Sequence, residues 1–334
     1  TAAAAPLFRK LALRLDVVDR PGEARKVHAR SIPYLGGLAF YLSFLAVGLM
    51  AEALFPAYSI RAFMPMALGG TLIVLMGLYD DIYDMPSLPK LLIELVIGVV
   101  LYFWGFEARD IASPFGGTFH AGMLAILITP LWIAGVMNAI NFTDGLDGLA
   151  AGLVFICAAT MFAIGYRNGQ TVSCVLMAYL MGTTLGFLPY NFNPATMFMG
   201  DTGALFLGFV LGAATLIEQQ KGVAVIALAI PVTVMAVPIL DTILSFTRRL
   251  RRAREGRFFT PDRNHLHHRL LAAGMSHRQV VLLLYFVSLC MGALAFALSL
   301  VSVAQKFIVI GLAGVLIVVA VMALHYFEGR TPEK

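Results

Sequence analysis

Charged residues are scarce in this chain of 334 residues. Asp, Glu, Lys and Arg make up 13% of it, whereas 60% of its residues are hydrophobic. A soluble globular domain has about 25% charged residues, so the composition excludes a soluble enzyme and a disordered chain. Cysteine is scarce too, because Cys157, Cys174 and Cys290 lie in apolar runs without metal-ligand spacing. This excludes a disulfide scaffold and leaves a polytopic membrane protein.

Long apolar runs predict an all-α protein that crosses the membrane many times. A spanning helix needs about 20 apolar residues, and we expect spans over 34–55, 62–79, 88–106, 122–140, 146–165, 171–189, 202–219, 222–246, 280–301 and 306–327. The chain starts with Thr1, and we identify no cleavable signal peptide. We expect residues 1–8 to be the remnant of a truncated first span, which gives ten or eleven spans. No linker or internal repeat is visible, which predicts a single membrane domain over residues 1–334.

The basic residues predict the orientation of these spans. If the loops alternate, the side that holds residues 1–33 carries 19 of the 24 Lys and Arg residues. Cytoplasmic loops are enriched in Lys and Arg, so this side is expected to be cytoplasmic. The net charge of +5 then reflects orientation against anionic lipid rather than nucleic-acid binding. Most aspartates fall at the same face, which predicts that the chemistry takes place there.

The first acidic cluster is Asp80-Asp81-Ile82-Tyr83-Asp84, followed by Lys90. On a helix end, Asp80 and Asp84 share a face and Asp81 lies about 100° away. Carboxylates this close repel unless a cation gathers them or one keeps its proton. Such hard oxygen donors favour Mg²⁺ or Mn²⁺. The alternative is a solvated loop that caps the next helix.

Two further clusters carry amides and carboxylates. Asn138, Asn141, Asp144 and Asp147 are spaced by three residues and form one stripe on a helix end, suited to a cation, a nucleobase or a ribose. A helix cap explains one of these aspartates but not the whole stripe. The segment Phe198-Met-Gly-Asp-Thr-Gly begins a span, where its aspartate is either a helix cap or part of a metal–phosphate site. Its phenylalanine is either a packing residue or a face for a base.

Basic residues gather in two cytoplasmic segments. The loop 247–280 holds nine arginines and the run Pro261-Asp-Arg-Asn-His-Leu-His-His. Arg and His suit phosphate groups, and no cysteine lies nearby to complete a zinc site. Most of the arginines are expected only to orient the chain. The same interpretation is favoured for the basic residues between Asp19 and His28.

In this order, DDIYDMP, NAINFTDGLDGLAAG, FMGDTG and PDRNHLHH resemble the motifs of the polyprenyl-phosphate N-acetylhexosamine-1-phosphate transferase superfamily, over about residues 16–280. VDRPGEARKVHARSIPYLGG and PDRNHLHHRLLAAG look closest to its GlcNAc-1-phosphate branch. The resemblance implies a multi-pass enzyme of the bacterial inner membrane whose active site faces the cytoplasm. Its reaction would join UDP-GlcNAc and undecaprenyl phosphate, or another polyprenyl phosphate, into polyprenyl-diphosphate-GlcNAc and UMP. Mg²⁺ or Mn²⁺ would serve as cofactor, the product would feed O-antigen, common antigen or teichoic acid synthesis, and a homodimer is expected by analogy.

The resemblance also implies roles for single residues. Asp201 and Asn141 would hold the metal, with Asp80 and Asp81 beside it. Asp80 would orient or deprotonate the lipid phosphate. The candidate catalytic residues are Asp80, Asp81, Asp144, Asp147 and His265. The candidate substrate-binding residues are Lys26, His28, Lys90, Asn138, Asp147, Phe198, Arg249, Asp262, Arg263, His265, His267 and His268, among which Asp147 and Phe198 would hold uracil.

Other functions stay open at this point. The same chemistry could use UDP-MurNAc-pentapeptide or a different UDP-N-acetylhexosamine. An ion-coupled transporter would also carry intramembrane acids, but it would place them near the midplane, often in repeated halves. A receptor or scaffold has no positive signal in the sequence. Direct attack by the lipid phosphate is favoured over a covalent phosphosugar enzyme, because one metal-organised site could hold both substrates.

Overall fold

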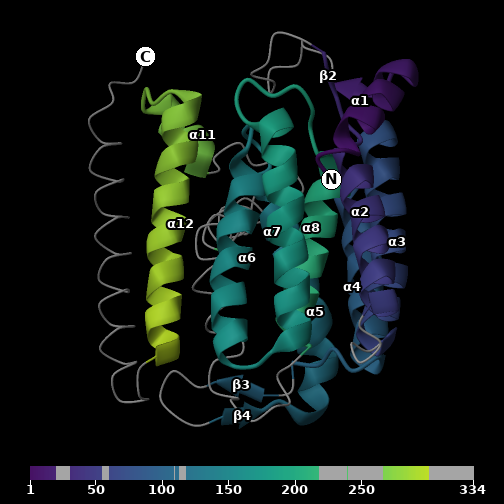
Figure 1. Cartoon of the computed structure of the whole chain (residues 1–334), viewed down its shortest axis with the longest axis vertical. Coiled ribbons are helices and arrows are strands. Elements are labelled where there is room, and N and C mark those ends of the chain that lie inside the picture. Colours follow the sequence, from purple (N-terminus) through teal and green to yellow (C-terminus); the bar gives the residue numbers. More distant parts are fainter. Residues whose placement is uncertain are drawn as a thin grey trace, which may run out of the picture.

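The computed structural model describes residues 1–19, 31–54, 60–108, 110–112, 118–217, 239 and 266–300. Within them the long helices lie side by side along one axis (Figure 1). In chain order the α-helices of the described part are α1 (Ala5–Arg14), α2 (Gly36–Leu54), α3 (Ile60–Tyr83), α4 (Ser87–Phe103), α5 (Ala125–Thr143), α6 (Leu149–Arg167), α7 (Thr171–Asn191), α8 (Gly200–Ala214), α11 (Leu266–Ala272) and α12 (His277–Leu300). The short 3-10 helix η1 (Gly122–Leu124) precedes α5. Two antiparallel hairpins pair β1 (Val18–Asp19) with β2 (Ile32–Pro33) and β3 (Asp110–Ala112) with β4 (Thr118–His120).

The expected membrane spans are helical wherever the structure describes them, and five of them are confirmed as helices that could cross a membrane. The runs from 34–55 to 202–219 coincide with helices α2 to α8, and the run 280–301 coincides with α12. Among the described residues, five segments are long and apolar enough to cross a membrane: Phe63–Tyr83, Gly122–Thr143, Leu149–Arg167, Thr171–Asn191 and His277–Leu300. The chain is therefore a helical, polytopic membrane protein. The expected spans 222–246 and 306–327 lie outside the described residues.

Helix α1 lies where we expected the remnant of a first span. It is ten residues long and packs against α2 and β2. Ala5 and Ala12 are buried, whereas Leu7 and Leu11 are exposed. Its basic Arg9 reaches across to the carbonyl oxygen of Thr196, with an Nε–O distance of 3.2 Å. The helix thus joins the amino-terminal region to the loop between α7 and α8.

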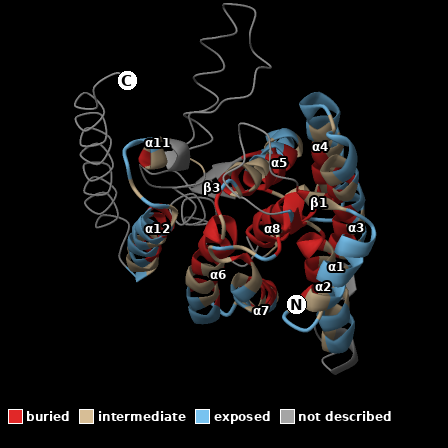
Figure 2. Cartoon of the chain, turned by 90° about the horizontal axis from the view of Figure 1, so that it is seen from above, coloured by how far each residue is buried: buried red, intermediate tan, exposed pale blue. Residues whose placement is uncertain are grey.

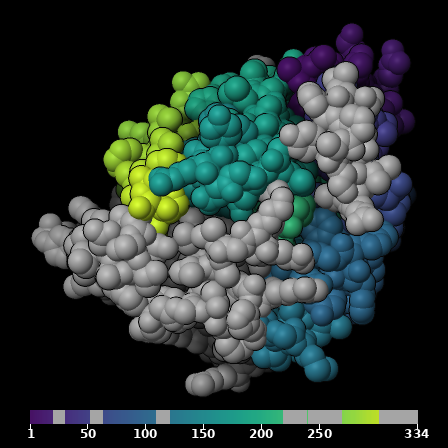
Figure 3. Space-filling model, turned by 60° about the horizontal axis from the view of Figure 1, so that its bottom comes forward, coloured from purple at the N-terminus to yellow at the C-terminus, as the bar shows by residue number. Residues whose placement is uncertain are grey.

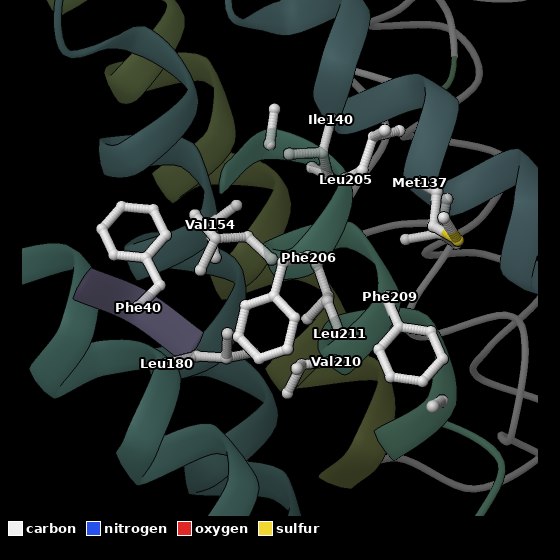
Figure 4. Packing of buried hydrophobic residues seen from close by; sticks show 14 of the residues in the cluster. Phe40, Met137, Ile140, Val154, Leu180, Leu205, Phe206, Phe209, Val210 and Leu211 are labelled. Carbon is white, nitrogen blue, oxygen red and sulfur yellow. The ribbon is translucent and has the colours of Figure 1, made fainter. Parts of the chain in front are cut away.

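Helix α8 forms the centre of the bundle. All its residues from Thr202 to Ala214 are buried, and α2, α3, α5 and α7 surround it (Figure 2). A helix that is apolar on every side is typical of a protein core or a membrane span, and α8 has protein neighbours on all sides. Figure 4 shows its side chains Phe206 and Phe209 among those of Phe40, Met137 and Leu180 from the surrounding helices. Packing against the surrounding helices therefore fixes the position of the backbone next to Asp201.

Glycines let the backbones of α2 and α3 approach the start of α8. A Cβ atom at Gly37 would lie 2.3 Å from the backbone nitrogen of Gly203. A Cβ atom at Gly77 would lie 2.5 Å from Cα of Thr202. Small residues at such contacts are the usual way in which membrane helices pack closely. As a result, the acidic end of α3 lies against the acidic start of α8.

Helix α12 is attached through a second, smaller hydrophobic cluster. Val280, Val281 and Leu284 of α12 pack with Leu146 and Leu149 at the start of α6. The Tyr285 hydroxyl of α12 also donates a hydrogen bond to the carbonyl oxygen of Gly148. Seen from the end that carries β3 and β4, α12 (yellow) lies directly against the teal helices (Figure 3). This contact ties α12 to the loop that holds Asp144 and Asp147.

The contact at Gly77 predicts a loss of stability on substitution. In Gly77→Ala the new methyl group meets the backbone of α8, and overpacking of this kind costs about 1–3 kcal/mol. We expect a lower midpoint of thermal unfolding in detergent. Gly182→Ala is the control, because nothing lies within 4 Å of its added Cβ atom, so its midpoint should be unchanged or slightly raised. Equal midpoints for the two variants would contradict the packing described here.

Candidate active site

A polar cavity of about 820 Å³ lies at one end of the bundle. The carboxyl-terminal ends of α3, α5 and α7 and the amino-terminal ends of α8 and α12 surround it. Aspartates dominate its wall: Asp19, Asp80, Asp81, Asp84, Asp144, Asp147 and Asp201. So many carboxylates in one cavity next to an apolar bundle repel one another unless positive charge compensates them. The site therefore suits cations, together with anionic groups that bind to those cations.

Lys90 joins two of these carboxylates. Its Nζ atom lies 2.6 Å from Oδ2 of Asp80 and also forms an ion pair with Oδ2 of Asp201. Asp80 belongs to α3, Lys90 to α4 and Asp201 to α8. The backbone nitrogen of Met85 donates a further hydrogen bond of 2.6 Å to Oδ1 of Asp80. A positive charge therefore already occupies the position between the two carboxylates.

Asp81 caps the amino terminus of α8. Its Oδ1 accepts a hydrogen bond of 2.7 Å from the backbone nitrogen of Asp201, and its Oδ2 accepts bonds from the backbone nitrogen and the hydroxyl of Thr202, at 3.2 and 2.6 Å. Gly200 makes this possible: its φ is +69°, and an added Cβ atom would lie 2.4 Å from Oδ2 of Asp81. The cap of α8, one of the two roles expected for Asp201, is thus supplied by Asp81 from another helix.

Asn141 and Asp144 lie at the end of α5 and face the same carboxylates. The Asn141 side chain interacts with Asp201. Asp144 is half-buried and follows the last turn of α5. Burial and the nearby carboxylates of Asp201 and Asp81 raise the pKa of Asp144 well above the ordinary value of an aspartate. A cation bound near these carboxylates would instead lower the pKa of Asp144.

Asp147 fixes the loop between α7 and α8. Its Oδ2 accepts hydrogen bonds from Nδ2 of Asn193 and from the backbone nitrogen of Ala195, both at 3.0 Å. A buried amide of α7 completes the arrangement: Asn191 accepts from the backbone nitrogen of Gly148 and donates to the carbonyl oxygen of Met197, at 3.1 and 3.2 Å. A carboxylate has about four lone-pair sites, so Asp147 keeps acceptor capacity for a ligand.

An aromatic pair forms part of the cavity wall. The rings of Phe198 and Tyr34 are 6.2 Å apart and tilted by 46°. The backbone nitrogen of Phe198 donates to the carbonyl oxygen of Pro33 at 2.9 Å, which holds the two loops together. The Tyr34 hydroxyl interacts with the buried carboxylate of Asp19. Tyr34 and Asp19 both line the cavity, although the motifs gave neither of them a chemical role.

Most of the predicted site residues that the structure describes come together here. Seven of them line the cavity: Asp80, Asp81, Asn141, Asp144, Asp147, Phe198 and Asp201. Lys90 reaches it through its ion pairs. Asn138 is not among the described lining residues; its amide donates to Glu94 and, at 2.9 Å, to the carbonyl oxygen of Ala134.

The predicted site residues of the two basic segments fall largely outside the described part of the chain. This applies to Lys26, His28, Arg249, Asp262, Arg263 and His265. His267 and His268 belong to α11, but their side chains also lie outside the described part of the chain. Their assigned roles stay predictions. The cavity residues that sequence analysis missed, such as Asn193 and His277, stand alone in the sequence and gave no motif.

The donor set fits Mg²⁺ better than a metal that needs an all-protein cage. No three His, Cys, Asp or Glu side chains in the described part of the chain form a ready-made metal group. Mg²⁺ does not need one, because it binds through one or two carboxylates together with water and substrate phosphates. Asp80, Asp201 and the amide of Asn141 are such a set. The two oxygens of Asp80 accept one hydrogen bond each, from Met85 and Lys90, whereas those of Asp81 accept three, all of which cap α8.

Comparison with known proteins places this arrangement in a family. A sequence model described as glycosyl transferase family 4 matches residues 63–219, the stretch from α3 to α8. A protein of Bacillus subtilis named probable undecaprenyl-phosphate N-acetylglucosaminyl 1-phosphate transferase is 37% identical over 283 residues, 84% of this chain and 77% of that protein. The chain belongs to glycosyl transferase family 4.

Two further relatives carry related names. The decaprenyl-phosphate N-acetylglucosaminephosphotransferase of Mycobacterium leprae is 40% identical over 86% of this chain and 77% of its own length. The undecaprenyl-phosphate alpha-N-acetylglucosaminyl 1-phosphate transferase of Escherichia coli is 28% identical over 83% of this chain and 75% of its own length. The resemblance drawn from the motifs is therefore confirmed. The family match contains the cavity aspartates from Asp80 to Asp201.

The hydrogen bonds by which Asp81 caps α8 predict that two buried threonines contribute differently to the stability of the fold. Thr202→Val removes the hydroxyl that donates to Asp81, and a hydrogen bond to a charged group contributes about 1.5–3 kcal/mol. Thr184→Val is the control, since that hydroxyl is equally buried but only donates to the carbonyl oxygens of Leu180 and Met181 in its own helix. We expect a clearly lower unfolding midpoint in detergent for Thr202→Val only. The same loss in both variants would show that the cap does not matter.

Proposed function

We propose that this protein transfers GlcNAc-1-phosphate from UDP-GlcNAc to undecaprenyl phosphate or a closely related polyprenyl phosphate. The products are polyprenyl-diphosphate-GlcNAc and UMP. The observation that carries the proposal is the acidic cavity at the end of an apolar bundle, in which Lys90 joins Asp80 to Asp201. A water-soluble nucleotide and a membrane lipid can meet only at such a boundary. The names of the relatives favour the same donor and acceptor class.

The reaction exchanges one phosphoanhydride for another. An oxygen of the lipid phosphate bonds to the phosphorus that carries GlcNAc, the bond from that phosphorus to the bridging oxygen breaks, and UMP leaves with this oxygen. Both reactants are anions, so catalysis depends mainly on position and charge neutralisation. No strong nucleophile has to be generated. Direct attack in one site is therefore favoured over a covalent intermediate.

Mg²⁺ is the proposed cofactor, with Asp201, Asp80 and Asn141 as its protein ligands. When bound, it would neutralise charge on the diphosphate of the donor. Lys90 supports the same site, because its ammonium group keeps Asp80 and Asp201 close together despite their like charge. Asp80 would then orient or deprotonate the lipid phosphate. Mn²⁺ has the same preference for oxygen ligands.

The other cavity residues suit the nucleotide. Asp147 retains free lone pairs and would accept a hydrogen bond from uracil, and the ring of Phe198 offers a face on which the base can stack. Asp144 would support the nucleotide or the metal. Beyond the described residues, the Arg and His side chains of the loop 247–280 would contact the diphosphate or GlcNAc. Lys26 and His28 would meet phosphate oxygens.

We further propose that the cavity faces the cytoplasm of a bacterial cell and that the chain lies in its inner membrane. In the described part, Arg9, Lys90 and Arg278 lie at the cavity end of the bundle, as expected for the positive side. The product would begin a cell-envelope polysaccharide. Homodimer formation remains a prediction. An ion-coupled transporter is disfavoured because these aspartates gather at one end rather than at midplane.

The donor is tested by UMP release in detergent, with undecaprenyl phosphate and Mg²⁺. We expect lipid-dependent UMP from UDP-GlcNAc and none from UDP-MurNAc-pentapeptide. Asp201→Asn should lower the rate at least about 100-fold, because it removes a carboxylate ligand of the metal ion that would neutralise the diphosphate. Asp16→Asn makes the same charge change at an exposed position outside the cavity and should keep the rate. UMP from the pentapeptide donor alone would overturn the proposed substrate.

The cofactor is tested separately. Removal of divalent metal with EDTA should abolish UMP release, and added Mg²⁺ should restore it. In Asp201→Asn, restoration should need more Mg²⁺ because one carboxylate ligand is weakened. Zn²⁺ should not substitute, since the proposed ligands Asp201, Asp80 and Asn141 offer oxygen donors rather than the nitrogen and sulfur donors that Zn²⁺ prefers. Full activity after complete metal removal would contradict the proposed magnesium site.

A further inference from the structure

His277 is the first residue of α12 and lines the cavity, but no step of the proposed reaction uses it. Its Nε2 atom is buried and has no hydrogen-bond partner in the described part of the chain. Buried polar atoms of this kind are rare and costly in folded proteins, where a partner normally satisfies them. An unpartnered ring nitrogen in the wall of a substrate cavity is a place where a ligand can supply that partner.

The position of His277 is fixed from both sides along the chain. Ser276 and Gln279 form a reciprocal cap: the backbone nitrogen of Ser276 donates to Oε1 of Gln279 at 2.8 Å, and the backbone nitrogen of Gln279 donates to Oγ of Ser276 at 3.4 Å. Arg278 donates to the carbonyl oxygen of Asn193 at 3.0 Å. The backbone at His277 is therefore held at the cavity before any ligand arrives, which reduces the entropy that binding would cost.

These contacts place His277 on the Asp147 side of the cavity. Asn193 and Ala195 donate to Asp147, and Arg278 next to His277 binds the same loop. The acidic pair Asp80 and Asp201 instead belongs to α3 and α8. In Figure 2, α12 and α3 lie on opposite sides of the molecule with α8 between them. A nucleotide whose diphosphate lies at the acidic pair would therefore extend toward His277 with its nucleoside.

The chemistry of the side chain suits that end of the ligand. Seven aspartates line the cavity as acceptors, whereas the neutral imidazole ring of His277 carries one donor and one acceptor nitrogen. Uridine offers both kinds of group, in its carbonyl oxygens, imide and ribose hydroxyls. An imidazole can pair with any of these without adding another negative charge.

We propose that His277 binds the nucleotide donor by a hydrogen bond from Nε2 to its uridine part. This inference rests on the proposed function, because it assumes a uridine nucleotide in the cavity. It adds a residue of α12 to a site whose other described binding residues come from segments between Asp19 and Asp201. It also gives α12, with its attachment to the loop of Asp144 and Asp147, a direct part in recognition.

The test is calorimetric binding of UMP and of UDP-GlcNAc to the full chain in detergent with Mg²⁺. We expect His277→Ala to raise both dissociation constants by the same factor, about tenfold, the effect of one hydrogen bond. His277→Gln retains a polar group of similar reach and should recover part of the affinity. Ser288→Ala is the matched control: it removes another buried polar group of α12 that has no partner in the described part of the chain, but outside the cavity, and should leave UMP binding within about twofold.

Steady-state kinetics give a second readout. The KM for UDP-GlcNAc should rise in His277→Ala, while the KM for undecaprenyl phosphate stays the same. Unchanged UMP binding in a folded His277→Ala variant would overturn the inference, and so would a loss limited to UDP-GlcNAc, which would place the contact on the sugar. An equal loss in Ser288→Ala would show a structural effect on α12 only, and would overturn the inference. If the wild-type chain binds neither ligand, the proposed function itself fails.

Discussion

The contact between the end of α3 and the start of α8 is the constraint on which the site depends. Gly77 lets the two backbones meet, and Asp81 fastens them by accepting three hydrogen bonds from Asp201 and Thr202. Without this contact Asp80 and Asp201 would belong to separate helices with no fixed distance between them. Like charges would drive them apart, and Lys90 alone would have to hold them. Because of the cap, the folding of the bundle itself brings Asp80 and Asp201 close together.

The same contact explains why the sequence predicts the site better than the roles within it. Apolar runs identify the spans, and the alternation of loops is sufficient to place Asp80, Asp144 and Asp201 at one face. Nothing in the motifs distinguishes Asp80 from Asp81, although one joins an ion pair and the other caps a helix. That difference depends on which neighbour each side chain meets across the bundle. Local sequence does not contain this information.

Asn138 and His277 show the same limit of sequence analysis. The motifs include Asn138, which does not line the cavity, and miss His277, which does. Asn138 shares a three-residue spacing with Asn141, and the pattern predicts a common stripe toward the substrate. In the structure its amide turns to the buried carboxylate of Glu94 on α4. His277 stands in no motif, and only the packing of α12 against the start of α6 brings it to the cavity. Periodicity finds residues on one helix face, but it cannot find those that tertiary packing adds.

The charge balance of the cavity links the described fold to the rest of the chain. Seven aspartates line the wall, and Lys90 neutralises at most two of them. Such a site can bind an anionic nucleotide only if further positive charge is supplied, either by a cation that binds with the nucleotide or by other residues of the protein. A divalent ion at Asp80 and Asp201 would supply one part. The arginine- and histidine-rich loop that leads into α11 and α12 is in the right place along the chain to supply another, because α12 is already anchored beside Asp147. The acidic wall would then serve metal binding, and the Arg and His side chains of that segment would serve phosphate binding.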